Sequence, residues 1–294
     1  MNKIFNVLFT GMLALGIMTA NAESQIFKKK KKKNNISTEQ TDSVKKDSAA
    51  NYKKLLKGAK TTEGMFKIHQ VKDKYYFEIP KKLMARDFMI SSRVSSTSNN
   101  KDVAAGQMPR NPVVVTFSAD NKKVYMHRKM LRNLCDTTSN MYKAFQRNYS
   151  DPIWEAYKIE SISPDSSAYV IDMTPLFITD VPEFSPFRSG NIMDVLMKRK
   201  PLSGSLSSAK SAILGIKCFP LNINIKSLMS YTVNGGPFTV TMTRNIILLP
   251  EKTMRPRYSD SRIGYFDENK YLFTEKQDGL QELSYINRWD LQPK

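Results

Sequence analysis

The alternation of apolar and polar positions along the chain predicts many short β-strands. The clearest hairpin pattern has two runs rich in aromatic and β-branched residues on either side of the polar Lys72-Asp73-Lys74. The same pattern recurs further along, with turn residues between the runs. The predicted strands are Met65–Val71, Tyr75–Pro80, Asp87–Ser95, Val113–Ser118, Lys123–Lys129, Ile153–Ile162, Ala168–Met173, Ala212–Ser230, Phe238–Leu249, Ile263–Phe266, Tyr271–Thr274 and Leu283–Trp289.

Helical patterns are few and short. They cover Tyr52–Ala59, Lys81–Ala85, Ser139–Asn148 and a short helix that opens at Thr174-Pro175. Because predicted strands outnumber helices and follow one another closely, the chain is expected to be a β-rich α+β protein. Its sheets should be mainly antiparallel, with a few short helices.

Two composition changes divide the chain. Residues 23–50 are a Lys-rich, low-complexity linker, expected to be disordered because no apolar period offsets the entropy of ordering. The polar stretch Ser95–Gly106 indicates a second boundary. We therefore expect two tandem domains of unassigned function after the linker. These are a small hairpin-containing domain at 51–104 and a larger β-rich domain at 105–294.

The first 22 residues have the organisation of a secretory signal peptide. Lys3 precedes a mostly apolar stretch, Ile4–Met18, which is followed by the small-x-small cleavage pattern Ala20-Asn21-Ala22. No later segment is apolar enough to span a membrane. The sequence thus predicts export to the periplasm, the outer surface or the extracellular space.

The net charge of +19 is unevenly distributed, and about half of it lies between Lys28 and Lys60, including the hexalysine Lys28–Lys33. This segment could be attracted to anionic envelope polymers, or it could be only a solvated linker, which is the interpretation we favour. Basic and aromatic residues also alternate around Arg255, Arg257 and Tyr258, a pattern found in nucleic-acid binding. Export argues against that partner.

The chain has two histidines, His69 and His127, both in predicted strands on faces that carry lysine, and we expect both at the surface. Neither fits the H-E-x-x-H zinc motif. The two cysteines, Cys135 and Cys218, are too few and too far apart for a structural zinc site. They could pair in one disulfide, although two free thiols are the alternative that we favour.

Carboxylates are the remaining candidates for chemistry. A glycosidase-type pair could be built from Asp172, Asp180 and Glu183, but sequence does not give their separation. A group of oxygen ligands between Asp260 and Asn269 does not have the spacing of the twelve-residue calcium loop, and polar turns explain it better. The sequence therefore predicts no catalytic residue, no cofactor and no metal site.

Several segments resemble the N-terminal, pre-catalytic region of large exported zinc-dependent metalloproteases of the metzincin-like type from Gram-negative bacteria. The most specific pieces are the lysine-aspartate-lysine hairpin and P-R-x-x-D-x-R-x-G-Y-F. The segments are Tyr52–Leu56, Glu63–Pro80, Arg86–Phe88, Val170–Phe177, Leu248–Glu251, Met254–Phe266 and Tyr285–Lys294.

The resemblance implies a signal peptide and two domains of unassigned function, after which Y-I-N-R-W-x-L-x-P-K leads into a catalytic domain. The zinc-binding H-E-x-x-H-x-x-G-x-x-H helix of that domain has no counterpart here, so no zinc ligand or catalytic glutamate is carried over. The expected role is a non-catalytic accessory module with a scaffolding, substrate-binding or pro-domain-like function. The alternatives are a stand-alone envelope-associated protein held by Lys28–Lys33 and a hydrolase that uses a carboxylate pair.

A contact surface is expected where charged and aromatic residues are most closely spaced. Such a cluster suits a binding patch for a protease domain or a peptide, and it also suits a salt-bridged corner, which is the role we favour. Its members are Arg255, Arg257, Asp260, Arg262, Tyr265 and Phe266.

Overall fold

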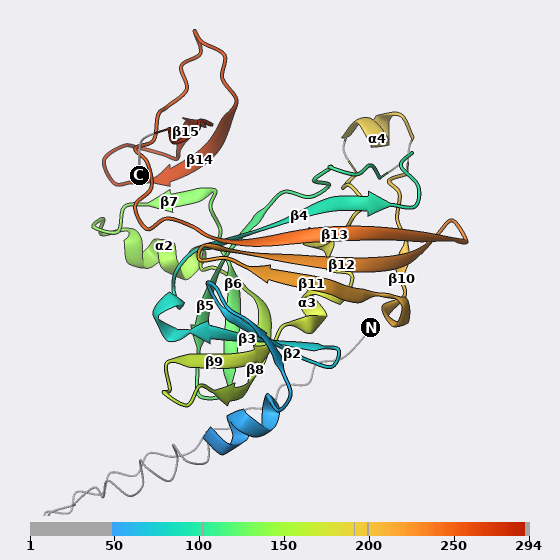
Figure 1. The fold of residues 1–294 in the computed structure, drawn as a ribbon. Helices are drawn as coiled ribbons and strands as arrows, with labels where there is room; N and C mark the ends of the chain where they lie inside the picture. The colour runs from blue at the N-terminus through green and yellow to red at the C-terminus, as the bar shows by residue number, and fades with distance from the viewer. Residues whose placement is uncertain (1–48, 102, 191, 199, 292–294) are drawn as a thin grey trace, which may run out of the picture.

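The computed structural model describes residues 49–291 apart from 102, 191 and 199 (Figure 1). The signal peptide and the hexalysine lie outside the described residues. Strands dominate and the helices are short, which confirms the predicted β-rich α+β class with mainly antiparallel sheets.

A helix over residues 49–55 opens the described part and precedes Gly58, which has a φ of 72°. The strands are β1 (Lys60–Thr62), β2 (Lys67–Val71), β3 (Lys74–Pro80), β4 (Phe88–Thr97), β5 (Val113–Ala119), β6 (Lys123–Arg128), β7 (Asn133–Cys135), β8 (Ile153–Ile162), β9 (Ala168–Asp172), β10 (Ser205–Leu206), β11 (Ala212–Cys218), β12 (Asn222–Val233), β13 (Gly236–Leu248), β14 (Asp267–Phe273) and β15 (Gln281–Ile286). The other helices are η1 (Lys81–Leu83), α2 (Tyr142–Asn148), α3 (Thr174–Ile178), η2 (Pro182–Phe184), α4 (Ile192–Leu196) and η3 (Ser208–Lys210).

Twelve strands form one large sheet in the order β1-β2-β3-β9-β8-β6-β5-β4-β13-β12-β10, and β11 also pairs with β12. Strands from residues 51–104 and from 105–294 share this sheet, because β3 pairs with β9 and β4 pairs with both β5 and β13. The two segments are therefore joined by backbone hydrogen bonds.

Two tight turns set the register of the sheet. Lys72, with a φ of 54°, turns β2 into β3, and the residues at this turn are the polar ones expected there. Asn234 and Gly235, with φ values of 49° and 78°, join β12 to β13. Positive φ at two consecutive residues is the geometry that asparagine-glycine hairpins adopt most readily.

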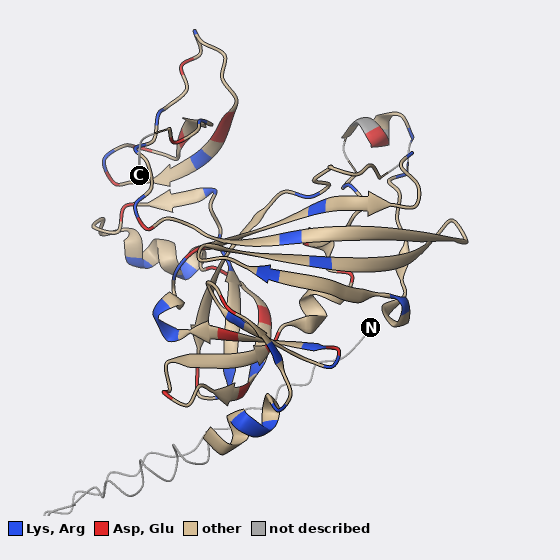
Figure 2. Ribbon diagram, in the orientation of Figure 1, with Lys and Arg blue, Asp and Glu red and all other residues tan. Residues whose placement is uncertain are grey.

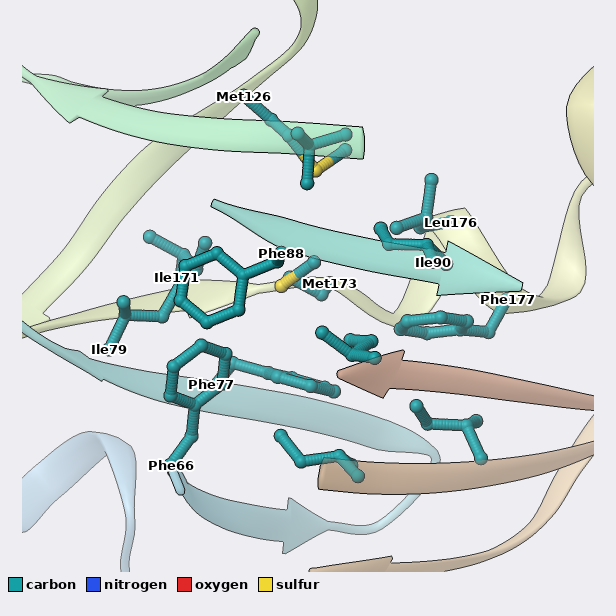
Figure 3. Close-up of a cluster of buried hydrophobic side chains, with 14 of the residues drawn as sticks. Phe66, Phe77, Ile79, Phe88, Ile90, Met126, Ile171, Met173, Leu176 and Phe177 are labelled. Atoms are coloured by element: carbon teal, nitrogen blue, oxygen red, sulfur yellow. The ribbon is translucent and has the colours of Figure 1, made fainter. Parts of the chain in front are cut away.

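The main apolar core lies inside the curled sheet, where the side chains drawn in Figure 3 meet. Phe66 packs on Phe88, and Phe88 on Phe117, with ring centroids 5.6 and 5.5 Å apart. Phe77 stacks on Phe177 of α3 at 5.8 Å. A smaller cluster around Met229, Tyr231 and Phe238 continues the burial toward the far end of β12 and β13.

The strand predicted at Ala212–Ser230 is wrong as a single element. The structure breaks it into β11 and β12 at Phe219–Leu221, where the chain reverses direction. Pro220 explains the break, because proline has no backbone N–H to donate to a sheet ladder.

The strand predicted at Ile263–Phe266 is also wrong, since this segment is irregular in the structure. The pair predicted at the end of the chain is confirmed as β14 and β15. They form a second sheet of order β15-β14-β7, in which β7 runs parallel to β14. Within the described residues no helix is long and apolar enough to cross a bilayer.

Candidate functional site

The six residues expected to form a contact surface lie on the irregular segment between β13 and β14. This segment runs beside β15, because the amide of Ile286 donates to the carbonyl of Arg257 at 2.9 Å. The rings of Tyr258 and Tyr285 pack at 5.3 Å. Strand pairing thus brings the segment around residue 260 and the segment after residue 285 to the same end of the molecule.

Asp260 and Arg262 form the salt-bridged corner that the spacing indicated. The Arg262 guanidinium donates two hydrogen bonds to the Asp260 carboxylate, at 2.7 and 2.9 Å. These bonds hold the pKa of Asp260 below its ordinary value. The pair fixes the loop, and Tyr265 and Phe266 beyond it project into solvent, Phe266 with 90 % of its surface exposed.

The sheet β15-β14-β7 has no core of its own. No described residue from Leu249 to Leu291 is buried, and β7 and α2 contain no buried residue either. Small antiparallel sheets need an apolar face packed on another layer to be stable independently. Here Phe273 makes an aromatic contact with Phe145 of α2 and with Tyr149 just after it, at 5.4 and 5.0 Å.

Large apolar side chains are exposed over this whole end of the molecule, which is at the upper left of Figure 1. Trp289 and Leu291 are 85 % and 88 % exposed, close to the value for Phe266. We call this set the C-terminal surface. Its members are Met254, Tyr258, Ile263, Tyr265, Phe266, Leu280, Trp289 and Leu291.

A basic hollow of about 660 Å³ opens next to these residues. Four cationic side chains and one carboxylate contribute to its lining, so its potential is positive. The lining residues are Lys252, Thr253, Met254, Arg255, Pro256, Arg257, Arg288 and Asp290. Spacing in the sequence places Arg255 and Arg257 together but does not reveal Arg288 and Trp289. These two follow β15, which hydrogen-bonds to residues 257–259.

A family model matches the part of the chain that contains the C-terminal surface. The model of a domain of unknown function, DUF5117, matches residues 106–294. The chain belongs to this family. A second domain of unknown function, DUF5118, matches residues 49–97. No curated protein and no solved structure matches the chain.

The DUF5117 region contains β5 to β15, and with them the whole C-terminal surface. The DUF5118 region contains the first helix and β1 to β4. The two regions therefore have separate family descriptions but share the large sheet.

His69, in the DUF5118 region, is not the surface residue that the alternation predicted, since only 4 % of it is exposed. Tyr52 of the helix at 49–55 packs against His69, and β1 lies beside β2 with Thr61 opposite His69. His69 Nε2 donates to the Glu78 carboxylate at 3.0 Å, and its Nδ1 shares a hydrogen bond with the Thr61 hydroxyl at 2.8 Å. Tyr52 donates to the same Glu78 oxygen at 2.6 Å. This network fastens the first helix and β1 to the sheet.

The other candidate catalytic groups are held apart by separate partners. His127 lies on β6 and bonds to Ser118 at 2.8 Å. Asp172 pairs with Lys74 at 3.1 Å, and Glu183 with Arg128 at 2.9 Å. In the part of the chain that is described, no three His, Cys, Asp or Glu side chains gather as metal ligands would.

Cys135 and Cys218 are free thiols, the first in β7 and the second in β11. Burial raises the pKa of Cys218 to about 11, so this thiol is protonated at neutral pH and is a weak nucleophile.

Arg244 is a buried cation that the sequence did not single out. It is 1 % exposed on β13 and donates to the carbonyl of Phe177 at 3.0 Å. Its guanidinium also lies 5.7 Å from the ring centre of Phe184. Burial lowers the pKa of Arg244 to about 10. These contacts tie α3 and η2 to the sheet.

Glu78→Gln should lower stability and remove part of the acid sensitivity. Burial would raise the pKa of Glu78, but hydrogen bonds from His69 and Tyr52 outweigh it, so this pKa lies below its ordinary 4.5. A carboxylate whose pKa is lowered in the folded state stabilises the folded protein above about pH 4.5. That stabilisation is lost as the pH falls through the folded-state pKa. Urea unfolding should show a deficit of about 1–3 kcal/mol at pH 6 that shrinks toward pH 3.

Glu268→Gln is the matched control, because Glu268 is exposed on β14. It should change the unfolding free energy by less than about 0.5 kcal/mol. A deficit in Glu78→Gln that stayed constant from pH 6 to pH 3 would contradict this role of the carboxylate.

Proposed function

We propose that this protein is a non-catalytic accessory module of an exported zinc-dependent metalloprotease. It docks on the protease catalytic domain through the C-terminal surface and scaffolds it. The observation that carries the proposal is the absence of any buried residue between Leu249 and Leu291, although this stretch forms an ordered sheet with many large apolar side chains.

The energetics of burial favour a protein partner for this surface. Monomeric proteins rarely expose large contiguous apolar patches unless the patch is an interaction site, so the many exposed large apolar side chains at this end favour such a site. Each square ångström of apolar surface that a partner removes from water contributes about 25 cal/mol. Phe266 and Trp289 are almost fully exposed, so their burial by a partner would contribute much of the binding free energy.

The composition of the surface fits a protein interface better than a small-molecule site. Aromatic residues, methionine and arginine are enriched in the centre of interfaces, and here they stand together as Tyr265, Phe266, Trp289, Met254 and the arginines of the hollow. The positive hollow favours a partner with acidic side chains at the facing position.

The resemblance supports the choice of partner. The C-terminal surface is built mostly from Met254–Phe266 and Tyr285–Leu291, two stretches that resemble the pre-catalytic region of exported metalloproteases. In that family the second stretch leads directly into the catalytic domain, so a surface formed by it is well placed to contact that domain.

Phe266→Ala and Trp289→Ala should each weaken binding to a purified catalytic domain of such a metalloprotease by about tenfold or more, as hot-spot aromatics do. Isothermal titration calorimetry gives the affinity. Phe219→Ala is the matched control, since Phe219 is 43 % exposed between β11 and β12 and is not part of the C-terminal surface, and it should leave the affinity unchanged.

Equal affinity of all three variants and the wild type would contradict docking at the C-terminal surface. Zinc-dependent peptide cleavage by the purified chain alone would contradict the non-catalytic role.

A second candidate function is retention on anionic envelope polymers, and the four cations that line the hollow favour it. Lys28–Lys33, outside the described residues, would add to the attraction. Deleting Lys28–Lys33 should then release the protein from envelopes at lower salt than the wild type, because exposed charges are screened. Retention that is unchanged by the deletion and by salt would exclude this role.

A further inference from the structure

The large sheet curls until its two ends face each other. β1 is the strand at one end of the sheet, and β11 lies at the other end. The chain segments that follow the C-terminal ends of these two strands contact each other. The amide of Met65 donates to the carbonyl of Phe219 at 2.8 Å. A Cβ built on Gly64 would lie 2.7 Å from Cβ of Cys218, so only glycine allows this approach. We call the gap between β1 and β11 the seam.

The ring of strands cannot close at the seam with antiparallel pairs alone. Every pairing from β1 through β2, β3, β9, β8, β6, β5, β4, β13 and β12 to β11 is antiparallel. This path joins an odd number of strands, so β1 and β11 run in the same direction. Within the described residues neither strand pairs with another on the edge that faces the seam.

A hollow of about 240 Å³ occupies the seam. Apolar side chains and strand edges line it. The lining residues are Lys60, Thr62, Ile68, Gln70, Tyr75, Ile213, Leu214, Gly215 and Ile216. The β-bulge between Ile213 and Gly215 turns Leu214 outward, where it is 54 % exposed at the mouth.

A second hollow, of about 440 Å³, continues from the first over the outer face of β11 and β12. The two share Leu214, Gly215 and Ile216. Lys217 and Lys226 line the second hollow, Lys60 lines the first, and no carboxylate lines either. Figure 2 shows the same excess of positive charge, since β11 and β12 each carry a basic residue and no acidic one.

We propose that the seam binds an extended peptide segment that carries alternating apolar and acidic side chains. The segment adds to the free edge of β11 as an antiparallel strand, a direction that also suits β1. Unpaired backbone groups of the edge supply affinity, as in other cases of strand addition. Apolar side chains enter the hollow beside Leu214, and acidic side chains meet the lysines.

One added strand makes the number of strands in the ring even, so that all neighbours can be antiparallel. The direct bond between Met65 and Phe219 closes one end of the seam, and the peptide therefore enters at the other end, beside Lys60 and Ile213. This site is independent of the C-terminal surface and does not rest on the proposed function.

The test uses the purified full chain and a fluorescein-labelled octapeptide of alternating valine and glutamate, with blocked ends. Fluorescence anisotropy should show saturable binding below about 1 mM, the weak end of specific affinities. The same peptide with every second amide N-methylated should bind at least about tenfold more weakly, because it cannot pair as a strand. A peptide of alternating valine and lysine should also bind at least about tenfold more weakly, because its lysines repel the lysines that line the two hollows.

Gly215→Val fills the seam without disturbing the fold, since a Cβ at this position meets no atom within 4 Å and its φ is not in the left-handed region. It should weaken binding by about tenfold or more. Gly264→Val is the matched control, because Gly264 is equally open but lies outside the seam, and it should bind as the wild type does.

Absence of binding by the wild type up to 1 mM would overturn the proposal, and so would unweakened binding of the N-methylated or the lysine peptide. Unchanged affinity in Gly215→Val would do the same. The N-methylated peptide is measured on the wild type, so the result does not depend on how well a variant folds. Phe266→Ala should bind the peptide normally, which separates this site from docking.

Discussion

Burial of apolar side chains inside the curled sheet is the constraint on which the rest of the structure depends. Phe77, Phe88 and Phe117 come from three different strands and Phe66 from the bend before β2, and each is almost fully buried. Segments that reach this core are fixed by it, and the hydrogen-bond network around Glu78 fastens the first helix to the sheet. The segment after Leu248 does not reach it. Its sheet is held by backbone pairing and a few aromatic contacts, and its apolar side chains remain available to a partner.

Much of the fold follows from local pattern. The turn at Lys72-Asp73-Lys74 is predictable because polar residues separate two apolar runs, and Asn234-Gly235 is a dipeptide that adopts positive φ readily. The alternation in β5, β6, β8 and β9 was sufficient to find these strands. The split between β11 and β12 could also have been predicted, since Pro220 signals it. The curl of the sheet could not, because it depends on pairings such as β3 with β9 and β4 with β13, far apart in the sequence.

The candidate site was predictable only in part. Close spacing placed Arg255 to Phe266 in one patch, and the structure keeps them on one segment. Arg288 and Trp289 join this end of the molecule through the pairing of β14 with β15, which sequence spacing does not reveal. His69 was assigned to the surface because alternation describes only one strand. Its burial depends on a helix and an edge strand that cover it from elsewhere.

The central claim is that the C-terminal sheet lacks a core and gains one from a catalytic domain. Amide hydrogen exchange of β14 and β15 tests this most directly, because exchange reports the free energy of local opening. The account predicts that their amides exchange much faster than those of β12 and β13 in the isolated chain, and that exchange slows when the catalytic domain is added. Exchange in β14 and β15 as slow as in β12 and β13 without any partner would contradict it.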